Sequence, residues 1–301
     1  MKRFIINILI FTALIVVVDF TYGLVCKFLV SNTHSGGTAR TAGLFLKNQY
    51  DIMVMGSSRC VCHYDDKLMS DSLGVSVINA GEKGNGIILM YGRYSLIPKD
   101  RKPRVLIYDV EPSFDVLAYK DDDKNKRYLG GLRLYYDNKK IQGIFKDVDW
   151  HEPLKMQSCL FRYNSHLFVL LRDYIRKGAP IMSCYNPSYN QYVAATGTKK
   201  NVHRSFDNTK LAYMEKMMVD SKRDGVQMIV VASPKYKAET MYPLEPIKDL
   251  CELNDIPFWD YYTTMQEEQW FCNDMHLNYE GSQEFSKKIV QRIKNEKLVN
   301  N

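Results

Sequence analysis

The stretch that most constrains this chain is residues 50–63, which begins as a strand and ends in a run of polar side chains. Residues 51–55 are a short apolar run of the kind found in parallel strands that are covered on both faces. Gly56 then permits a tight turn, and residues 57–59 read Ser-Ser-Arg. Ligands of open α/β sheets bind beyond the carboxyl ends of the strands, so a serine here is well placed to act as a nucleophile. The alternative is that the two serines only cap the helix that follows.

The rest of the chain repeats this alternation of short apolar strands with helices. A stretch at about 115–207 interrupts the alternation, and we interpret it as an insertion that roofs the carboxyl edge of the sheet. Strands separated by helices predict a three-layer α/β/α sandwich with a central parallel sheet. The predicted strands are 53–55, 75–79, 103–110, 226–232 and 256–260. The main predicted helices are 66–73, 87–96, 161–177, 208–223, 241–253 and 279–297.

The amino terminus predicts a membrane anchor. Lys2 and Arg3 precede an apolar run from about Phe4 to Cys26, close to the roughly 20 residues that span a bilayer. The positive charges should stay inside, which predicts a single-pass protein of the cytoplasmic membrane with its main domain in the periplasm or outside the cell. No small-x-small cleavage site ends the run, so we expect it to be uncleaved. Asp19 interrupts the run, and either marks a partner helix or is tolerated near the outer interface.

The predicted domain organisation follows from these patterns. Residues 1–30 form the cytoplasmic tip and the transmembrane anchor. A polar stretch that contains glycine, residues 31–40, is expected to be a linker. Residues 41–301 then form one α/β domain that carries the insertion, which is long enough to bury a large core.

Charge and cysteine content exclude some functions. The net charge is +7, but Lys and Arg are scattered rather than massed in a stripe, so we predict no binding to nucleic acid. Cys60, Cys62 and His63 lie close together in the sequence, but a structural zinc site needs four ligands and no second pair is evident. The sequence therefore implies neither a metal nor another cofactor.

Four polar segments, three following the predicted strands and one preceding the last helix, together resemble the SGNH/GDSL hydrolase superfamily. The resemblance is closest to its membrane-anchored bacterial branch, which includes O-acyltransferases and esterases of cell-envelope polysaccharides. It covers about residues 50–115 and 225–295 and implies an SGNH or flavodoxin-like sheet. The segments are Gly56-Ser57-Ser58-Arg59, Asn79-Ala80-Gly81-Glu82-Lys83-Gly84, Asp109-Val110-Glu111-Pro112-Ser113 and Asn273-Asp274-Met275-His276-Leu277-Asn278-Tyr279-Glu280-Gly281.

The resemblance implies a role for each matching residue. Ser58 matches the nucleophile, with Ser57 in place of the motif's aspartate, and His276 matches the base. The backbone N–H groups of Ser58 and Gly84 match oxyanion-hole donors, and Ser113 stands where the family has an oxyanion-hole asparagine. A serine hydroxyl needs an adjacent base to remove its proton. We therefore expect the hydroxyl of Ser58 to lie within hydrogen-bond reach of the His276 ring.

The acidic partner of the histidine departs from the family pattern. The family spacing, Asp-x-x-His, places Asn273 at the acid position and Asp274 one residue late. In an extended loop, Asp274 and His276 would point the same way, so we predict that Asp274 orients the ring. The alternatives are Asn273, a carboxylate from elsewhere such as Asp109 or Glu111, or a backbone carbonyl.

Two further residues of these segments are predicted to bind substrate. Arg59, next to the nucleophile, would hold an anionic substrate or instead pair with Asp51 or Glu111. Asn79, at the end of the second predicted strand, is the other candidate.

The resemblance implies an extracytoplasmic serine esterase or O-acyltransferase that acts on acyl groups of a glycan or other envelope polymer through an acyl-serine intermediate. Water as acceptor makes it an esterase, and a glycan hydroxyl makes it a transferase. The implied partners are the acylated polysaccharide, the membrane and a membrane protein that donates the acyl group. The departures at Ser113 and Asn273 support an alternative hypothesis, a catalytically degenerate domain that binds a glycan or acts as a scaffold in a secretion complex.

Overall fold

The computed structural model describes most of the chain, which forms two compact units. One unit consists of Met1–Gly43 and Leu129–Ile181, and the other of Leu44–Tyr128 and Met182–Asn301. The described residues are 1–118, 129–164, 166–194, 205–238 and 243–299.

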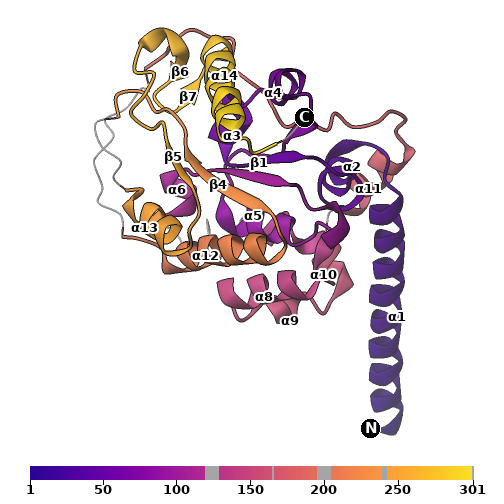
Figure 1. Ribbon diagram of the computed structural model, residues 1–301. Coiled ribbons are helices and arrows are strands. Elements are labelled where there is room, and N and C mark those ends of the chain that lie inside the picture. Colours follow the sequence, from indigo (N-terminus) through magenta and orange to yellow (C-terminus); the bar gives the residue numbers. More distant parts are fainter. Residues whose placement is uncertain (119–128, 165, 195–204, 239–242, 300–301) are drawn as a thin grey trace. The chain divides into compact units, whose positions relative to one another are not determined.

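A five-stranded parallel sheet forms the centre of the second unit (Figure 1). Its order, β2-β1-β3-β4-β5, is the flavodoxin-like order, so the predicted parallel sheet is confirmed. Gly56 at the end of β1 is paired with Asp109 at the end of β3, which brings the carboxyl ends of these strands to one edge. The strands are β1 (Ile52–Gly56), β2 (Val77–Asn79), β3 (Val105–Asp109), β4 (Gln227–Ala232) and β5 (Phe258–Asp260).

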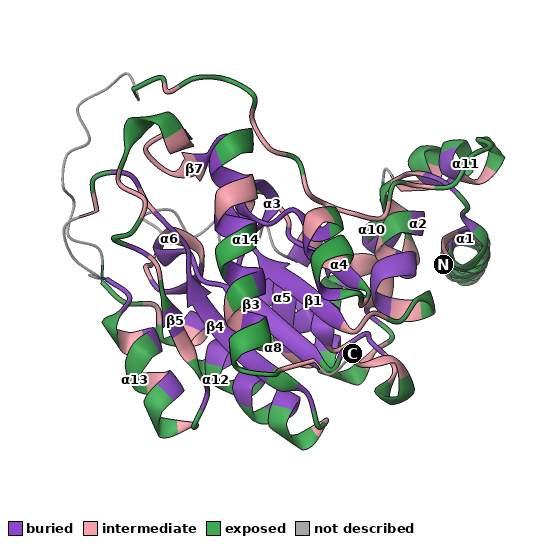
Figure 2. Ribbon diagram, turned by 45° about the horizontal axis from the view of Figure 1, so that its top comes forward, coloured by how far each residue is buried: buried purple, intermediate pink, exposed green. Residues whose placement is uncertain are grey.

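Helices cover both faces of this sheet, as the alternation predicts, and the sheet itself is almost wholly buried (Figure 2). Successive side chains of a strand point to opposite faces, so Ile52 and Val54 join one core with Phe285 and Ile289 of the last helix. One face carries α3 (Ser58–His63), α4 (Asp66–Leu73) and α14 (Tyr279–Asn295), and the other carries α5 (Ile87–Tyr94), α12 (Asn208–Arg223) and α13 (Glu245–Leu253); the short α6 (Pro112–Asp115) follows β3.

Side-chain caps explain where several helices begin. The carboxylate of Asp65 accepts a hydrogen bond from the N–H of Leu68 at 2.9 Å, and α4 begins after it. Asp207 caps α12 in the same way, with the N–H of Thr209 at 3.0 Å. An aspartate side chain thus satisfies backbone N–H groups at the start of each of these two helices.

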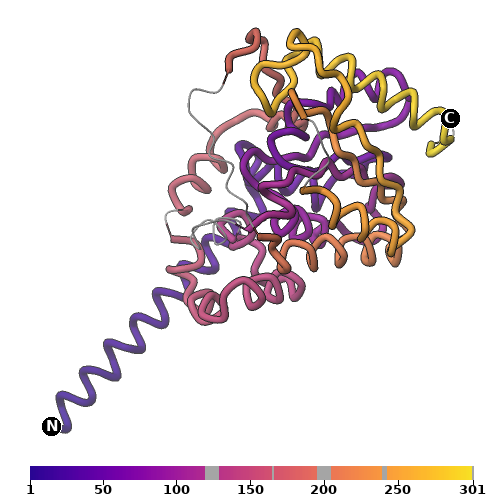
Figure 3. Tube along the Cα trace, turned by 90° about the vertical axis from the view of Figure 1, so that its left-hand side faces the viewer, coloured from indigo at the N-terminus to yellow at the C-terminus, as the bar shows by residue number. Residues whose placement is uncertain are grey.

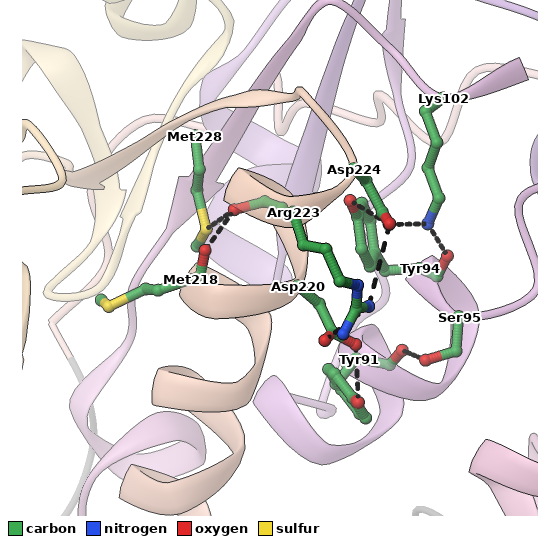
Figure 4. A network of polar contacts seen from close by, with 10 residues as sticks. Tyr91, Tyr94, Ser95, Lys102, Met218, Asp220, Arg223, Asp224 and Met228 are labelled. Atoms are coloured by element: carbon green, nitrogen blue, oxygen red, sulfur yellow. Dashed lines mark hydrogen bonds and ion pairs between the residues drawn. The ribbon is translucent and has the colours of Figure 1, made fainter. Parts of the chain in front are cut away.

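A buried polar network joins α5 to α12 (Figure 4). The hydroxyl of Tyr91 donates to Asp220 at 2.9 Å, and that of Tyr94 donates to Asp224 at 3.0 Å. The ammonium of Lys102 lies 3.2 Å from the Asp224 carboxylate, and only 7% and 13% of these two side chains are exposed. The Asp224 carboxylate therefore compensates a nearly buried positive charge.

We expect Asp224→Ala to lower the free energy of unfolding by about 3 kcal/mol, because it leaves the charge of Lys102 buried without its counter-ion. Urea denaturation measures this change. The matched control is Asp71→Ala, which removes the partner of Lys67 at 2.8 Å in an ion pair whose aspartate side chain is 68% exposed. That control should cost less than about 1 kcal/mol. Equal losses in both variants would contradict this account.

The first unit is built on α1 (Lys2–Asn32), one unbroken helix (Figure 3). It is long and apolar enough to cross a membrane, by length and composition, which fits an anchor or a signal sequence. Its later part buries Cys26 and Leu29 against Tyr163 and Leu170. The described residues of this unit also form α2 (Gly36–Ala42), α8 (Lys139–Val148), α9 (Glu152–Lys155), α10 (Cys159–Tyr163) and α11 (His166–Ile175).

Asp19 has a role that neither prediction included. Its carboxylate accepts hydrogen bonds from the Ser158 hydroxyl at 2.7 Å and from the N–H groups of Cys159 and Leu160 at 2.9 and 2.8 Å. It therefore caps α10 of the same chain, where the negative charge meets the positive end of a helix.

The predicted domain boundaries need two corrections. Residues 31–40 are mostly helical rather than a linker, since α1 reaches Asn32 and α2 begins at Gly36. Tertiary contacts hold this segment, because the buried hydroxyl of Ser35 donates to the carbonyl of Asp173 at 2.8 Å. The predicted insertion at 115–207 is also divided, because Leu129–Ile181 belongs to the unit that contains α1. Residues 119–128 and 195–204 of it lie outside the described residues.

Candidate active site

Ser58 and His276 meet at the carboxyl edge of the sheet, as expected from the sequence. Ser58 is the first residue of α3, directly after β1, and His276 lies in a two-stranded hairpin of β6 (Phe271–Asn273) and β7 (His276–Leu277). The Ser58 Oγ is 2.8 Å from the Nε2 of His276, although the two residues are 218 positions apart. This is the contact that a serine nucleophile and its base require.

The turn at Gly56 places Ser58 at this edge. Gly56 has a φ of +152°, and a Cβ at this position would lie 2.5 Å from the carbonyl oxygen of Asp109. A residue with a side chain would therefore force β1 and β3 apart. The helix starts two residues later, with Ser57 as its N-cap residue.

The other ring nitrogen of His276 faces Asn273. The Nδ1 atom lies 3.1 Å from the Oδ1 of Asn273, which also accepts the N–H groups of Met275 at 2.9 Å and of His276 at 3.0 Å. An amide oxygen only accepts, so Nδ1 carries the proton and Nε2 is left to accept the hydroxyl proton of Ser58. This is the tautomer that a general base requires.

The prediction that Asp274 orients the ring is wrong. Its carboxylate accepts a hydrogen bond from the Tyr192 hydroxyl at 2.7 Å, which raises the pKa of Tyr192 to about 12. The prediction assumed an extended loop, whereas the chain reverses here and pairs Asn273 with His276 across the hairpin. A tight turn brings together side chains three positions apart, so Asn273 takes the place that the family spacing gives it.

The other two carboxylates considered for this role are bound elsewhere. Asp109 accepts hydrogen bonds from the Tyr64 hydroxyl at 3.1 Å and the N–H of Ser233 at 3.2 Å. Burial raises the pKa of Asp109 to about 6, although the positive charge of Arg59 acts to lower it. Glu111 accepts the N–H of Phe114 at 3.1 Å at the start of α6. Asn273 is thus the side chain that faces Nδ1.

The surroundings of His276 disfavour its protonated form. Burial lowers the pKa of the ring to about 4, and the positive charges of Arg59 and Lys83 act in the same direction. Asn273 brings no negative charge that would oppose them. The ring is therefore a neutral acceptor at physiological pH.

This environment predicts the pH dependence of the reaction. A general base works unprotonated, so kcat/KM should stay constant as the pH falls through 6.5 and be lost only around pH 4. The pH profile of aryl acetate hydrolysis between pH 3 and 8 measures this. Asn273→Asp should move the acid limb upward, because a carboxylate at Nδ1 stabilises the imidazolium. A wild-type limb near pH 6.5 would contradict the account.

Arg59 does not contact substrate, contrary to the prediction. Its side chain is fully buried, and it donates to the carbonyls of Ser233 and Pro234, the latter at 3.1 Å. Its guanidinium also lies 5.3 Å from the centre of the Tyr262 ring. A buried cation beside the nucleophile nevertheless contributes positive potential to the site.

Asn79 is also buried rather than open to a substrate. Its Nδ2 donates to the carbonyls of Cys60 at 2.8 Å and Tyr64 at 2.9 Å, and its Oδ1 accepts the N–H of Gly81 at 3.1 Å. It therefore ties α3, which begins with Ser58, to the loop after β2. The prediction was wrong because a polar residue at a strand end satisfies backbone groups just as well as it binds ligands.

The predicted oxyanion donors follow neighbouring strands. Gly84, with a φ of +72°, lies in the loop after β2, and Ser113 lies in α6 after β3. Within the part of the chain that the structure describes, the N–H groups of Ser58 and Gly84 donate no hydrogen bond. Two such donors at adjacent strand ends suit an oxyanion hole, and this role stays a prediction.

The sequence did not indicate the role of His63. Its Nε2 accepts the N–H of Leu277 at 3.0 Å, so Nδ1 carries the proton and donates to the Ser233 hydroxyl at 2.9 Å. Burial holds the pKa of His63 well below its usual range. Both ends of α3 are thus bound to β7, Ser58 to His276 and His63 to the next residue. The sequence feature that could have identified His63 is its position five residues after Ser58, at the other end of the same helix. Among the described residues no group of His, Cys, Asp and Glu forms a metal site.

Comparisons with known proteins give structural neighbours only. No protein-family model and no curated protein sequence matches the chain. The solved neighbours include an acetyl xylan esterase, at 12% identity over 80% of this chain and 99% of that chain, with a TM-score of 0.42. They also include a variant of the acetylxylan esterase of Geobacillus stearothermophilus, at 10% identity over 82% of this chain and 94% of that chain, with a TM-score of 0.40. Another is a "lipolytic protein of G-D-S-L family" from Desulfitobacterium hafniense, at 10% identity over 80% of this chain and 98% of that chain, with a TM-score of 0.39.

Proposed function

We propose that the chain is a serine esterase or O-acyltransferase that acts on acyl groups of a glycan or another cell-envelope polymer. The observation that carries this proposal is the Ser58 hydroxyl 2.8 Å from Nε2 of His276, with Nδ1 of the same ring held by Asn273. The pair lies at the switch point of the sheet, where α/β folds place their ligands.

The reaction proceeds through an acyl-serine. As the Oγ of Ser58 bonds to the acyl carbonyl carbon, His276 takes the hydroxyl proton on Nε2. The tetrahedral intermediate collapses, the ester bond breaks, and the imidazolium returns the proton to the leaving alcohol. Water or a glycan hydroxyl then attacks the acyl-serine, giving its proton to His276, which returns it to Ser58. The first acceptor yields hydrolysis and the second yields transfer.

Positive potential supports this chemistry. The oxyanion that develops on the carbonyl oxygen would accept hydrogen bonds from the N–H groups of Ser58 and Gly84. The charges of Arg59 and Lys83, which lower the pKa of His276, favour the same oxyanion. They disfavour the imidazolium, however, and Asn273 cannot compensate for this as a carboxylate would. We therefore expect a slower enzyme than one with an aspartate at this position.

The amino terminus suits a reaction at the cell surface. We infer that α1 crosses the cytoplasmic membrane with Lys2 and Arg3 inside, which leaves the site in the periplasm or outside the cell. A membrane protein that carries the acyl group would be the donor partner of a transferase.

Product analysis with the full chain in detergent micelles tests this function. The probe is p-nitrophenyl acetate, alone and with a soluble polysaccharide acceptor, and His276→Ala gives the background rate. Release of p-nitrophenol above that background supports the proposal, and acetate found on the polysaccharide identifies a transferase. Equal rates in the two proteins would refute the enzyme and favour the catalytically degenerate domain.

A further inference from the structure

A polar cavity of about 520 Å³ lies beside the ends of the β6–β7 hairpin, in the unit that holds the candidate active site. One wall is the segment 189–192 of the insertion, and the other consists of residues that flank the β6–β7 hairpin. Neither Ser58 nor His276 lines the cavity. The mechanism above leaves it without a role.

The residues that line this cavity are tied to the hairpin that carries His276. Asn278, a lining residue, comes two positions after His276 and caps α14 through the N–H of Gly281 at 2.9 Å. Tyr192, on the other wall, donates to Asp274 in the turn before His276. The N–H of Tyr279 also donates to the carbonyl of Ser188 at 2.7 Å. A molecule in this cavity would therefore sit beside the catalytic hairpin.

The cavity presents flat aromatic rings to solvent. Tyr189 and Tyr279 stack with ring centres 5.0 Å apart and an angle of 24° between the rings. They are 77% and 38% exposed, so this pair is not part of the core. Exposed tyrosines offer an apolar face together with a hydroxyl, which suits a ligand that has both apolar C–H faces and hydroxyl groups.

The rest of the lining is polar, and its only charges are negative. Side-chain amides and the carboxylates of Glu268 and Glu280 surround the tyrosines, and no Lys, Arg or His is among the described lining residues. Amides and carboxylates accept hydrogen bonds from hydroxyl groups. The absence of aliphatic side chains disfavours an acyl chain, and the two carboxylates repel phosphate and uronate groups.

We propose that this cavity is a carbohydrate subsite that binds a neutral or amino sugar of the polymer whose acyl group reaches Ser58. One sugar face stacks on Tyr189, and its hydroxyl groups bond to the amides and carboxylates. A protonated amino group gains a further contact with Glu268 or Glu280. The place of the subsite in a reaction depends on the function proposed above, whereas its binding of sugar does not require turnover.

Calorimetric titration of the full chain with three tetrasaccharides tests the proposal. The probes are the tetramer of glucosamine, cellotetraose and tetragalacturonate. We expect the first two to bind and the third to bind at least about tenfold more weakly, because of charge repulsion. Tyr189→Ala should weaken binding of the first two about tenfold, and Glu268→Gln should reduce the preference for glucosamine over cellotetraose.

Two controls separate this proposal from the enzymatic one. Trp150→Ala removes another exposed aromatic ring, 67% accessible, that does not line the cavity, and it should leave sugar binding unchanged. Ser58→Ala should retain sugar binding while it loses turnover. The subsite is refuted if neither neutral nor amino tetrasaccharide binds, or if folded Tyr189→Ala binds them as tightly as the wild type. Sugar binding without any ester turnover would refute the enzyme and keep the subsite.

Discussion

Replacing Ser58 with alanine is expected to reduce aryl acetate turnover by at least about 10³-fold, because the oxygen that bonds to the acyl carbon is gone. The fold should survive, since Ser58 is the first residue of α3 and its hydroxyl contacts the base rather than the core. The initial rate of p-nitrophenol release, with circular dichroism to verify folding, measures this effect.

Ser57 supplies a matched control one position away. Its hydroxyl is fully buried and has no hydrogen-bond partner in the described structure, so Ser57→Ala removes an unsatisfied group. We expect that variant to retain activity within a few-fold. Loss of activity in Ser57→Ala, with retention in Ser58→Ala, would mean that the wrong serine has been assigned as nucleophile.

Replacing Asn273 with alanine is expected to lower kcat by about 10²-fold. The change removes the acceptor that holds the Nδ1 proton, so the ring loses its orientation and its tautomer preference. It also removes the acceptor of two backbone N–H groups in the turn. Asn273→Asp keeps an acceptor for all three donors and should restore the rate. This rescue separates a role in positioning the base from a general loss of structure.

Asp274→Asn and Tyr192→Phe are the comparisons for this prediction. Tyr192→Phe removes the hydroxyl that donates to Asp274, and Asp274→Asn removes the negative charge of the acceptor. Neither change touches the contact between Asn273 and His276, so we expect kcat to change by no more than a few-fold. If Asp274→Asn loses as much activity as Asn273→Ala, the carboxylate serves the histidine during the reaction after all.

The sequence predicts the sheet well because each strand is a short apolar run that ends at a turn. Residues 226–232, for example, are predicted as a strand and form β4 at Gln227–Ala232. The sequence suggests a helix after the two serines but not its extent, because the residues of α3 from Arg59 to His63 are all buried, which removes the amphipathic period by which helices are recognised. The β6–β7 hairpin escaped prediction because its strands have only three and two residues.

The same limits apply to the site. Ser58 and His276 were identified because the order of strands determines which loops meet at the carboxyl edge. Arg59 and Asn79 lie at that edge too, but burial directs them to backbone carbonyls, and burial of a polar residue is not evident from the sequence. The choice between Asn273 and Asp274 depended on the conformation of a two-residue turn, which the pattern of apolar residues in the sequence does not predict.

Labelling with a fluorophosphonate probe followed by peptide mapping tests whether Ser58 is the nucleophile and His276 its base. We expect a single adduct on the peptide that contains Ser58. It should form much more slowly in His276→Ala than in the wild-type chain, because that variant lacks the base. The probe needs no knowledge of the natural acyl group or acceptor. No adduct on Ser58 in the folded wild-type protein, or an adduct that forms as fast without His276, would contradict the claim that these two residues form a nucleophile and its base.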